Sequence, residues 1–297
     1  MTTERLIRIL VTITLVEMMA AIGMGVRLED LSRIGRNPGL LMRAAIANYV
    51  GVPLLTVGLL LWFGPAPMIS AGFLIVAVCP GAAYGPPFTS IARGNLATAV
   101  GLMVILAASS TICAPLLLRF LLPLMTESRT VRVDLLKMVV MLLLSQLLPL
   151  FAGLSVRQYR PALADRLRHP ADMVSTALNL CLLGLIVAIR FPMLAAIRLA
   201  AFMGMLALVA ASMGAGWLLG EAGSENRKAM TFTTSLRNVA VALMIATASF
   251  PATPAVTAVL VYGLFQTLLL AAVALVWGRL WTLASSPGSE AVHVQSQ

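Results

Sequence analysis

Two ionisable side chains stand inside long apolar stretches of this sequence, where charged groups are rare. Arg237 lies in TFTTSLRNVAVAL, and Glu17 interrupts the first apolar stretch of the chain. A guanidinium in such a place can pair with an anion or stand in for a bound cation, because it stays protonated. A carboxyl group there can relay a proton. The alternative for Arg237 is a structural brace, and for Glu17 a structural pair or a helix-packing contact at an oligomer surface.

Helix-breaking residues indicate how the chain would position these side chains. Residues 79–95, CPGAAYGPPFTSIARGN, bring Pro80, Gly81, Pro86 and Pro87 directly after the apolar run 68–78. Proline removes a backbone donor and clashes with the preceding turn, so a helix should open here. The Thr- and Ser-rich stretch around Arg237 is a second candidate break. In lipid, such breaks persist only inside protein or beside water, and secondary transporters use pairs of them to bind ligands.

The composition identifies the class of protein. Of 297 residues, 60% are hydrophobic and only 11% are charged, with a mean hydropathy of +0.96. We therefore expect an all-α polytopic membrane protein with the lipid bilayer as its main partner. The net charge of +10 comes from short loops between apolar runs, which argues against nucleic acid as a partner. The three cysteines and two histidines show no ligand spacing, and no hydrolase motif occurs, so we expect no metal, no cofactor and no enzyme activity.

Apolar runs bounded by charge, Pro or Gly predict nine membrane spans in one transmembrane domain, residues 1–283, with a disordered cytoplasmic tail at 284–297. The two breaks are five spans apart, which predicts two inverted five-helix repeats with the first helix of the first repeat missing. The predicted spans are approximately 7–26, 44–63, 68–90, 96–118, 135–156, 171–189, 199–220, 230–249 and 255–281.

The distribution of basic residues predicts the orientation. Twelve of the 21 Lys and Arg residues fall on the side that carries the tail, eight on the other, and Arg237 lies within a span. Basic residues gather on the cytoplasmic side of membrane proteins. We therefore expect a multi-pass protein of the inner (plasma) membrane, with the N-terminus outside and the C-terminus in the cytoplasm.

Four stretches resemble the bile acid:sodium symporter family. They are residues 23–53, the CPGAAYGPPFTSIARGN segment, GAGWLLG at 214–220, and TFTTSLRNVAVAL at 231–243. The family patterns are CPGG-x-x-SN…LA-x-G(N/D) for the second and E-x-G-x-QN-x-x-LA for the fourth. The resemblance implies panel helices (about 7–63 in part and 135–189), core helices (about 44–118 and 199–281) with two crossing, broken helices, and a ligand held between panel and core.

The chain departs from the family at the sodium ligands. Gly85 and Pro86 stand at the Ser-Asn positions of the first motif, while Ala99 and Met103 stand where a Ser and a Thr would be. In the last motif, the family's Glu and Gln are Thr233 and Arg237, while Asn238 is retained. A family Gln on another helix appears as Asn48. The resemblance therefore points to a divergent member that lacks the sodium-site residues.

These departures predict that sodium is not a partner and that Arg237 replaces it. Two monovalent cations a few ångströms apart would repel by several kcal/mol. We expect Arg237 to brace the crossing through hydrogen bonds to Asn48 and to exposed carbonyls near Pro80–Pro87. Glu17, in contrast, is a candidate for proton coupling and could face Arg237 across the binding cleft.

The sequence thus predicts a secondary transporter of a small organic anion, such as a bile-acid-like or other carboxylate or sulfonate, working by alternating access. A non-transporting membrane ligand-binding protein or sensor on the same fold, and a conventional sodium symporter with backbone ligands, remain alternatives. Gln146 and Asn179 are expected to be structural amides. The predicted substrate-binding residues are Asn48, Tyr84, Pro86, Ser235, Arg237, Asn238 and Gln266, and the predicted ion-replacing or coupling residues are Arg237, Glu17, Asn48 and Thr233.

Overall fold

The computed structural model describes residues 3–125, 134–195 and 199–284, and these residues form helices and connecting turns without a strand. The all-helical fold class is therefore confirmed. The first half of the chain contains α1 (Thr3–Gly25), α2 (Leu28–Gly35), α3 (Pro38–Ala45), η1 (Ile46–Gly51), α4 (Val52–Phe63), α5 (Pro67–Ala77), α6 (Gly85–Ile91) and α7 (Leu96–Met125).

The second half of the chain is also helical, and its helix break lies between α12 and α13. It contains α8 (Leu135–Leu142), η2 (Leu143–Leu147), α9 (Leu148–Tyr159), α10 (Pro161–Ala195), α11 (Leu199–Leu219), α12 (Ser224–Ser235), α13 (Val239–Ser249) and α14 (Pro254–Ala284). Within the described residues, seven helical segments are long and apolar enough to cross a membrane. Of the other two predicted spans, 68–90 falls on the interrupted pair α5 and α6, and 171–189 falls on α10. The count of nine stays a prediction, and the predicted tail lies outside the described residues from 285 onward.

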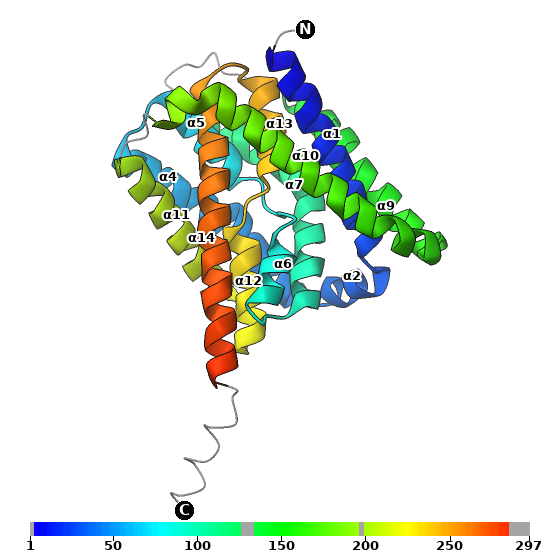
Figure 1. Cartoon of the computed structure of the whole chain (residues 1–297). Helices are drawn as coiled ribbons and strands as arrows, with labels where there is room; N and C mark the ends of the chain where they lie inside the picture. The colour runs from blue at the N-terminus through cyan, green and yellow to red at the C-terminus, as the bar shows by residue number, and fades with distance from the viewer. Residues whose placement is uncertain (1–2, 126–133, 196–198, 285–297) are drawn as a thin grey trace, which may run out of the picture.

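Helices α1, α9 and α10 pack together along one side of the molecule (Figure 1). Small residues allow α1 and α9 to approach closely, as is usual between membrane helices. A Cβ atom on Gly23 would overlap the backbone of Leu150, and one on Gly153 would overlap the backbone of Ala20. These three helices belong to the predicted panel, and we call them the panel helices.

The remaining long helices surround the two interruptions in the chain. Helix α5 packs on α14 and α7, while α12 packs on α11, α7 and α6. Close approach again depends on glycine, because a Cβ on Gly72 would overlap the backbone of Ala255 and one on Gly216 that of Thr231. We refer to α3–α7 and α11–α14 as the core helices (Figure 1).

Both predicted breaks are present. Helix α5 ends at Ala77, and the chain stays non-helical until Gly85, with Gly81 at φ +83° pressed against the backbone of Ala107. A side chain at Gly81 would clash with Ala107, and the positive φ angle is one that residues other than glycine rarely adopt. The second break is shorter: α12 ends at Ser235 and α13 begins at Val239, with Leu236 extended.

Two short π-helical segments were not predicted from the sequence. Segment η1 carries Asn48 and η2 carries Gln146, and both amides are buried. The Asn48 amide donates to the Ala44 carbonyl at 2.9 Å, and the Gln146 amide donates across to the Ala107 carbonyl of α7. A π-turn widens the helix locally and is often found at functional sites. In this chain the widened turn η1 turns Asn48 toward the second break.

Candidate functional site

The two breaks touch, and Asn238 joins them. Its backbone N–H donates to the Cys79 carbonyl at 2.7 Å, and its side-chain amide donates to the Gly81 carbonyl at 3.2 Å. Its side-chain oxygen accepts from the Val241 N–H at 3.2 Å and so caps the N-terminus of α13. Carbonyls freed by one break are therefore satisfied by a residue of the other, as membrane burial demands.

The guanidinium of Arg237 binds three buried acceptors at this junction. It donates to the Asn48 side-chain oxygen at 3.0 Å, to the Ala77 carbonyl at 3.2 Å, and to the Thr234 carbonyl. Ala77 is the last residue of α5 and Thr234 lies in the last turn of α12. The carbonyls at a helix C-terminus lack intrahelical donors and carry partial negative charge. The arginine therefore places its charge at the negative ends of two half-helices.

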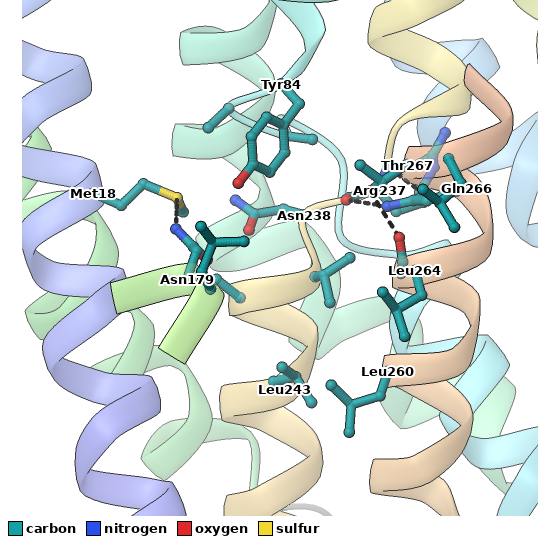
Figure 2. A pocket seen from close by; sticks show the side chains of 17 residues that line it. Met18, Tyr84, Asn179, Arg237, Asn238, Leu243, Leu260, Leu264, Gln266 and Thr267 are labelled. Atoms are coloured by element: carbon teal, nitrogen blue, oxygen red, sulfur yellow. Dashed lines mark hydrogen bonds between the residues drawn. The ribbon is translucent and has the colours of Figure 1, made fainter. Parts of the chain in front are cut away.

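The backbone of Arg237 is held by α14. Its N–H donates to the Gln266 side-chain oxygen at 3.0 Å, while the Gln266 amide donates to the Arg237 carbonyl at 2.9 Å (Figure 2). One glutamine thus satisfies both polar backbone groups of a residue that has no helix to do so. Hydrogen bonds therefore hold both the backbone and the guanidinium of Arg237 in place.

Arg237 carries a buried charge without a carboxylate partner among the described residues. The residue is only 1% exposed, and no described Asp or Glu forms an ion pair with it. Its Nε–H has no hydrogen-bond partner among the residues that the structure describes. A buried cation is costly unless it is compensated, and the compensation in this site comes from carbonyl and amide oxygens.

A cavity of about 210 Å³ lies between the panel helices and the junction of the breaks (Figure 2). Its floor and walls come from α1, α10, both breaks, α13 and α14. Most of the lining is apolar. The lining residues are Met18, Ala82, Ala83, Tyr84, Asn179, Leu180, Arg237, Asn238, Val239, Ala240, Leu243, Leu260, Gly263, Leu264, Gln266, Thr267 and Leu268.

The cavity offers hydrogen-bond donors and contains no acidic side chain among its described lining residues. Val239 and Ala240 open helix α13, and neither backbone N–H has a partner in the described part of the chain. Such N–H groups at a helix N-terminus attract anions. The half-exposed Tyr84 extends its ring into the same space, next to Asn238 (Figure 2). The arrangement is suited to a small anion with an apolar remainder.

Comparison with known proteins places the chain in a family. The model of the sodium bile acid symporter family matches residues 12–197, which is more than half of the chain. The chain belongs to this family. The matched region contains the first break but not the second. Because the family is one of transporters, membership agrees with the prediction that the chain is not an enzyme.

Three named relatives are similar to this chain. It is 25% identical over 247 residues to the protein named Uncharacterized sodium-dependent transporter YocS of Bacillus subtilis (strain 168), covering 81% of this chain and 74% of the relative. It is 24% identical over 170 residues to the Probable sodium/metabolite cotransporter BASS2, chloroplastic, of Oryza sativa subsp. japonica, covering 57% and 39%. It is 31% identical over 144 residues to the Probable sodium/metabolite cotransporter BASS1, chloroplastic, of Arabidopsis thaliana, covering 48% and 34%.

The structure brings four of the predicted site residues of this symporter-family member together. Arg237 is hydrogen-bonded to both Asn48 and Gln266. Asn238, the next residue in the chain, is hydrogen-bonded to the first break. The predicted acceptor carbonyls are those near Pro80–Pro87, whereas the guanidinium donates to the carbonyl of Ala77, at the end of the preceding helix, and to that of Thr234 in α12. Tyr84, Asn238 and Gln266 also line the cavity, whereas the acceptors of the guanidinium do not.

The other predicted residues lie outside the cavity lining. Pro86 is buried in the first turn of α6. Ser235 and Thr233 are buried in α12, and their hydroxyls donate to the carbonyls of Thr231 at 2.7 Å and Ala229 at 2.9 Å. A hydroxyl that bonds its own helix in this way has limited freedom to bind a ligand. These three residues pack the half-helices in this structure.

Glu17 is placed differently from the prediction that it could face Arg237. Its carboxylate accepts a hydrogen bond from the Ser175 hydroxyl of α10, and the structure describes no ion pair between Glu17 and Arg237. The contact joins two panel helices. This geometry agrees with one of the two alternatives for Glu17, a structural pair.

Sequence reasoning treated Asn179 as structural, but the residue lines the cavity together with Met18 and Thr267. Two further cationic side chains also donate to carbonyls near the ends of half-helices. Lys228 donates to the Ala92 carbonyl just after α6 at 2.8 Å, and Arg8 donates to the Thr247 carbonyl near the end of α13 at 3.2 Å. With Arg237, they give every half-helix of the two breaks a basic side chain at its C-terminal end. Lys228 lies on the same half-helix as the second break, which is a signal that the sequence offers, whereas Arg8 lies on α1, far from both breaks in sequence.

Proposed function

We propose that the chain is a secondary transporter of a small organic anion that is not coupled to sodium and in which Arg237 takes the place of a sodium ion. Transport occurs by alternating access, as the core helices shift against the panel helices around the cavity. The observation that carries the proposal is the contact of the Arg237 guanidinium with the last turns of α5 and α12.

The position of the guanidinium is the position that a cation would occupy. In transporters with broken helices, unwound carbonyls and half-helix C-termini coordinate the coupling ion. Arg237 already donates to two such carbonyls and to the Asn48 amide. A sodium ion about 4 Å away would be repelled by about 4 kcal/mol at an effective dielectric constant of about 20. No described carboxylate is present to offset that repulsion.

The geometry favours ion replacement over direct pairing of Arg237 with the cargo. The two terminal nitrogens of the Arg237 guanidinium donate to acceptors outside the cavity lining, and only its Nε–H is left without a partner among the described residues. The anionic group of the cargo would therefore lie at the N-terminus of α13. A cavity of about 210 Å³ is below the roughly 300–1,000 Å³ of sites for drug-sized ligands. This size favours a short carboxylate or sulfonate over a steroid-sized one.

The topology and orientation predicted from the sequence form part of the proposal. The proposed protein has nine spans, inverted repeats with the first helix missing, and an inner-membrane location with the N-terminus outside. Two observations support it: the two breaks pair with each other, and the described chain begins and ends at opposite ends of the molecule (Figure 1). An odd number of spans would produce the latter arrangement.

Conventional sodium symport is the second candidate function, and the names of the relatives favour it. All three relatives are named as sodium-dependent transporters or sodium cotransporters. A sodium site in this chain would have to be built from backbone carbonyls and hydroxyls, because the family's Glu is Thr233 and its Gln is Arg237.

Uptake into proteoliposomes separates these functions. The purified protein is reconstituted, and uptake of a set of radiolabelled small aliphatic carboxylates is measured with an inward gradient of sodium, potassium or choline. Uptake at equal rates with all three cations supports the proposal. Uptake that needs sodium identifies a conventional symporter. Saturable binding without uptake would indicate the non-transporting sensor considered from the sequence.

A further inference from the structure

The panel helices contribute three residues to the cavity: Met18 from α1, and Asn179 and Leu180 from α10. Asn179 is the polar member of this set. The core helices and the breaks supply the other lining residues, including Tyr84 and Asn238. Alternating access moves the core helices against the panel helices. A cargo that forms polar contacts with both sets of helices would therefore be bound from both sides of the cavity. Asn179 is therefore placed to provide the panel's polar contact.

The hydrogen bonds of Asn179 determine which atom of its side-chain amide, the nitrogen or the oxygen, can bind a ligand. Its side-chain nitrogen donates to the Ser175 carbonyl one helical turn earlier, at 2.9 Å. The same nitrogen lies 3.9 Å from the Met18 sulfur, a weak acceptor (Figure 2). Since a carbonyl can only accept, the atom that faces Ser175 must be the nitrogen. The side-chain oxygen has no partner among the described residues.

This arrangement differs from that of an amide that holds two membrane helices together. Such an amide would form a strong hydrogen bond to a neighbouring helix. The strong bond of Asn179 instead stays within α10, and its contact with α1 is to a thioether. An Asn at this position, with an unpaired acceptor beside a cavity, is better explained by a ligand than by helix packing.

We propose that Asn179 is the panel-side specificity residue, which accepts a hydrogen bond from an O–H or N–H donor on the cargo. The proposal rests on the function proposed above and extends it to the chemistry of the cargo. The anionic group lies at the N-terminal N–H groups of α13, and the donor group reaches across to Asn179. The cargo is therefore a small anion that carries a hydrogen-bond donor.

A matched pair of probes tests this inference. The probes are 2-hydroxy-3-methylbutanoate and 3-methylbutanoate, which differ by one hydroxyl group. Their dissociation constants are measured by calorimetry with the purified wild-type protein, with Asn179→Leu, and with Ser175→Ala as a control. The control removes the hydroxyl that binds Glu17 but keeps the carbonyl that orients Asn179.

We expect the hydroxylated acid to bind the wild type and Ser175→Ala about three- to tenfold more tightly than its partner, as one hydrogen bond would provide. In Asn179→Leu the two acids should bind equally, at the affinity of the weaker probe. If both acids bind the wild type equally, or if the preference survives in Asn179→Leu, the role of Asn179 is refuted while anion binding stands. If neither acid binds the wild type, the proposed function itself loses support and the inference falls with it.

Discussion

Replacing Arg237 by Gln removes the guanidinium while keeping an amide near the same backbone position. Three buried acceptors then lose their donor: the Asn48 side-chain oxygen and the carbonyls of Ala77 and Thr234. Gln266 continues to hold the backbone of residue 237, because it binds main-chain atoms. The substitution therefore tests the side chain without releasing the break itself.

The expected loss follows from the number of acceptors. Each buried acceptor without a partner costs about 1–3 kcal/mol. The shorter glutamine amide can restore one contact, which leaves two and a loss of about 2–6 kcal/mol. Removal of a desolvated charge offsets part of this loss. We therefore expect a net destabilisation of about 2–3 kcal/mol, or roughly 5–10 °C in the unfolding midpoint on the scale of soluble proteins.

The same substitution should create a response to sodium that the wild type lacks. The freed oxygens lie at two half-helix C-termini, where transporters commonly coordinate sodium. With a dissociation constant on the order of 10 mM, 100 mM sodium would restore about 1.4 kcal/mol. Potassium and choline should restore less, because the space left by a guanidinium fork is lined by only a few oxygens.

Thermal unfolding of the detergent-purified proteins in chloride salts of sodium, potassium and choline at equal ionic strength measures both effects. Arg36→Gln is the matched control, because Arg36 is exposed and carries the same change of charge. A wild type that sodium alone stabilises would refute the replacement of the ion by arginine. An Arg237→Gln variant as stable as the control would refute the bracing role of the guanidinium.

Three other substitutions test the packing around the site by the same thermal assay, with addition of the two probe acids in the second case. Gly153→Ala should destabilise the protein by about 1–3 kcal/mol, because its Cβ would overlap the Ala20 backbone; an unchanged midpoint would contradict the close approach of α1 and α9. Asn238→Ala should cost about 2–4 kcal/mol and weaken anion binding, since it removes both the cap of α13 and a bond between the breaks; retained stability would show that the backbone bond alone joins them. Lys228→Met should cost about 1–3 kcal/mol by leaving the Ala92 carbonyl without this donor, and a stabilised variant would mean that burying the ammonium outweighs the bond.

Much of the fold could be predicted because its signals are local. Pro80, Gly81 and Pro86 mark the first break by backbone chemistry alone, and the structure opens the helix between Ala77 and Gly85. The contact between Arg237 and Asn48 was expected from motif positions in the resemblance to the family. The number of membrane spans was harder to predict, because a broken helix such as the pair α5 and α6 consists of two short helices that together form one predicted span.

The orientation of isolated polar side chains could not be predicted. An amide in an apolar span such as Asn179 has the same sequence signature whether it packs helices or faces a cavity. Glu17 illustrates the same limit, because its partner Ser175 lies on a helix more than 150 residues further along the chain. The π-helical turns that position Asn48 and Gln146 also leave no pattern in hydrophobic periodicity.

A cation that is a side chain of the protein cannot be taken from one compartment and released into another. The guanidinium of Arg237 would thus contribute charge and structure to the crossing without contributing work from an ion gradient. Net flux would then follow the electrochemical potential of the cargo. For a monovalent anion carried alone, a membrane potential of 100 mV, inside negative, is worth about 2.3 kcal/mol. At equilibrium the anion would be about 50-fold more concentrated outside, so a carrier of this kind would serve release unless metabolism keeps the internal concentration low.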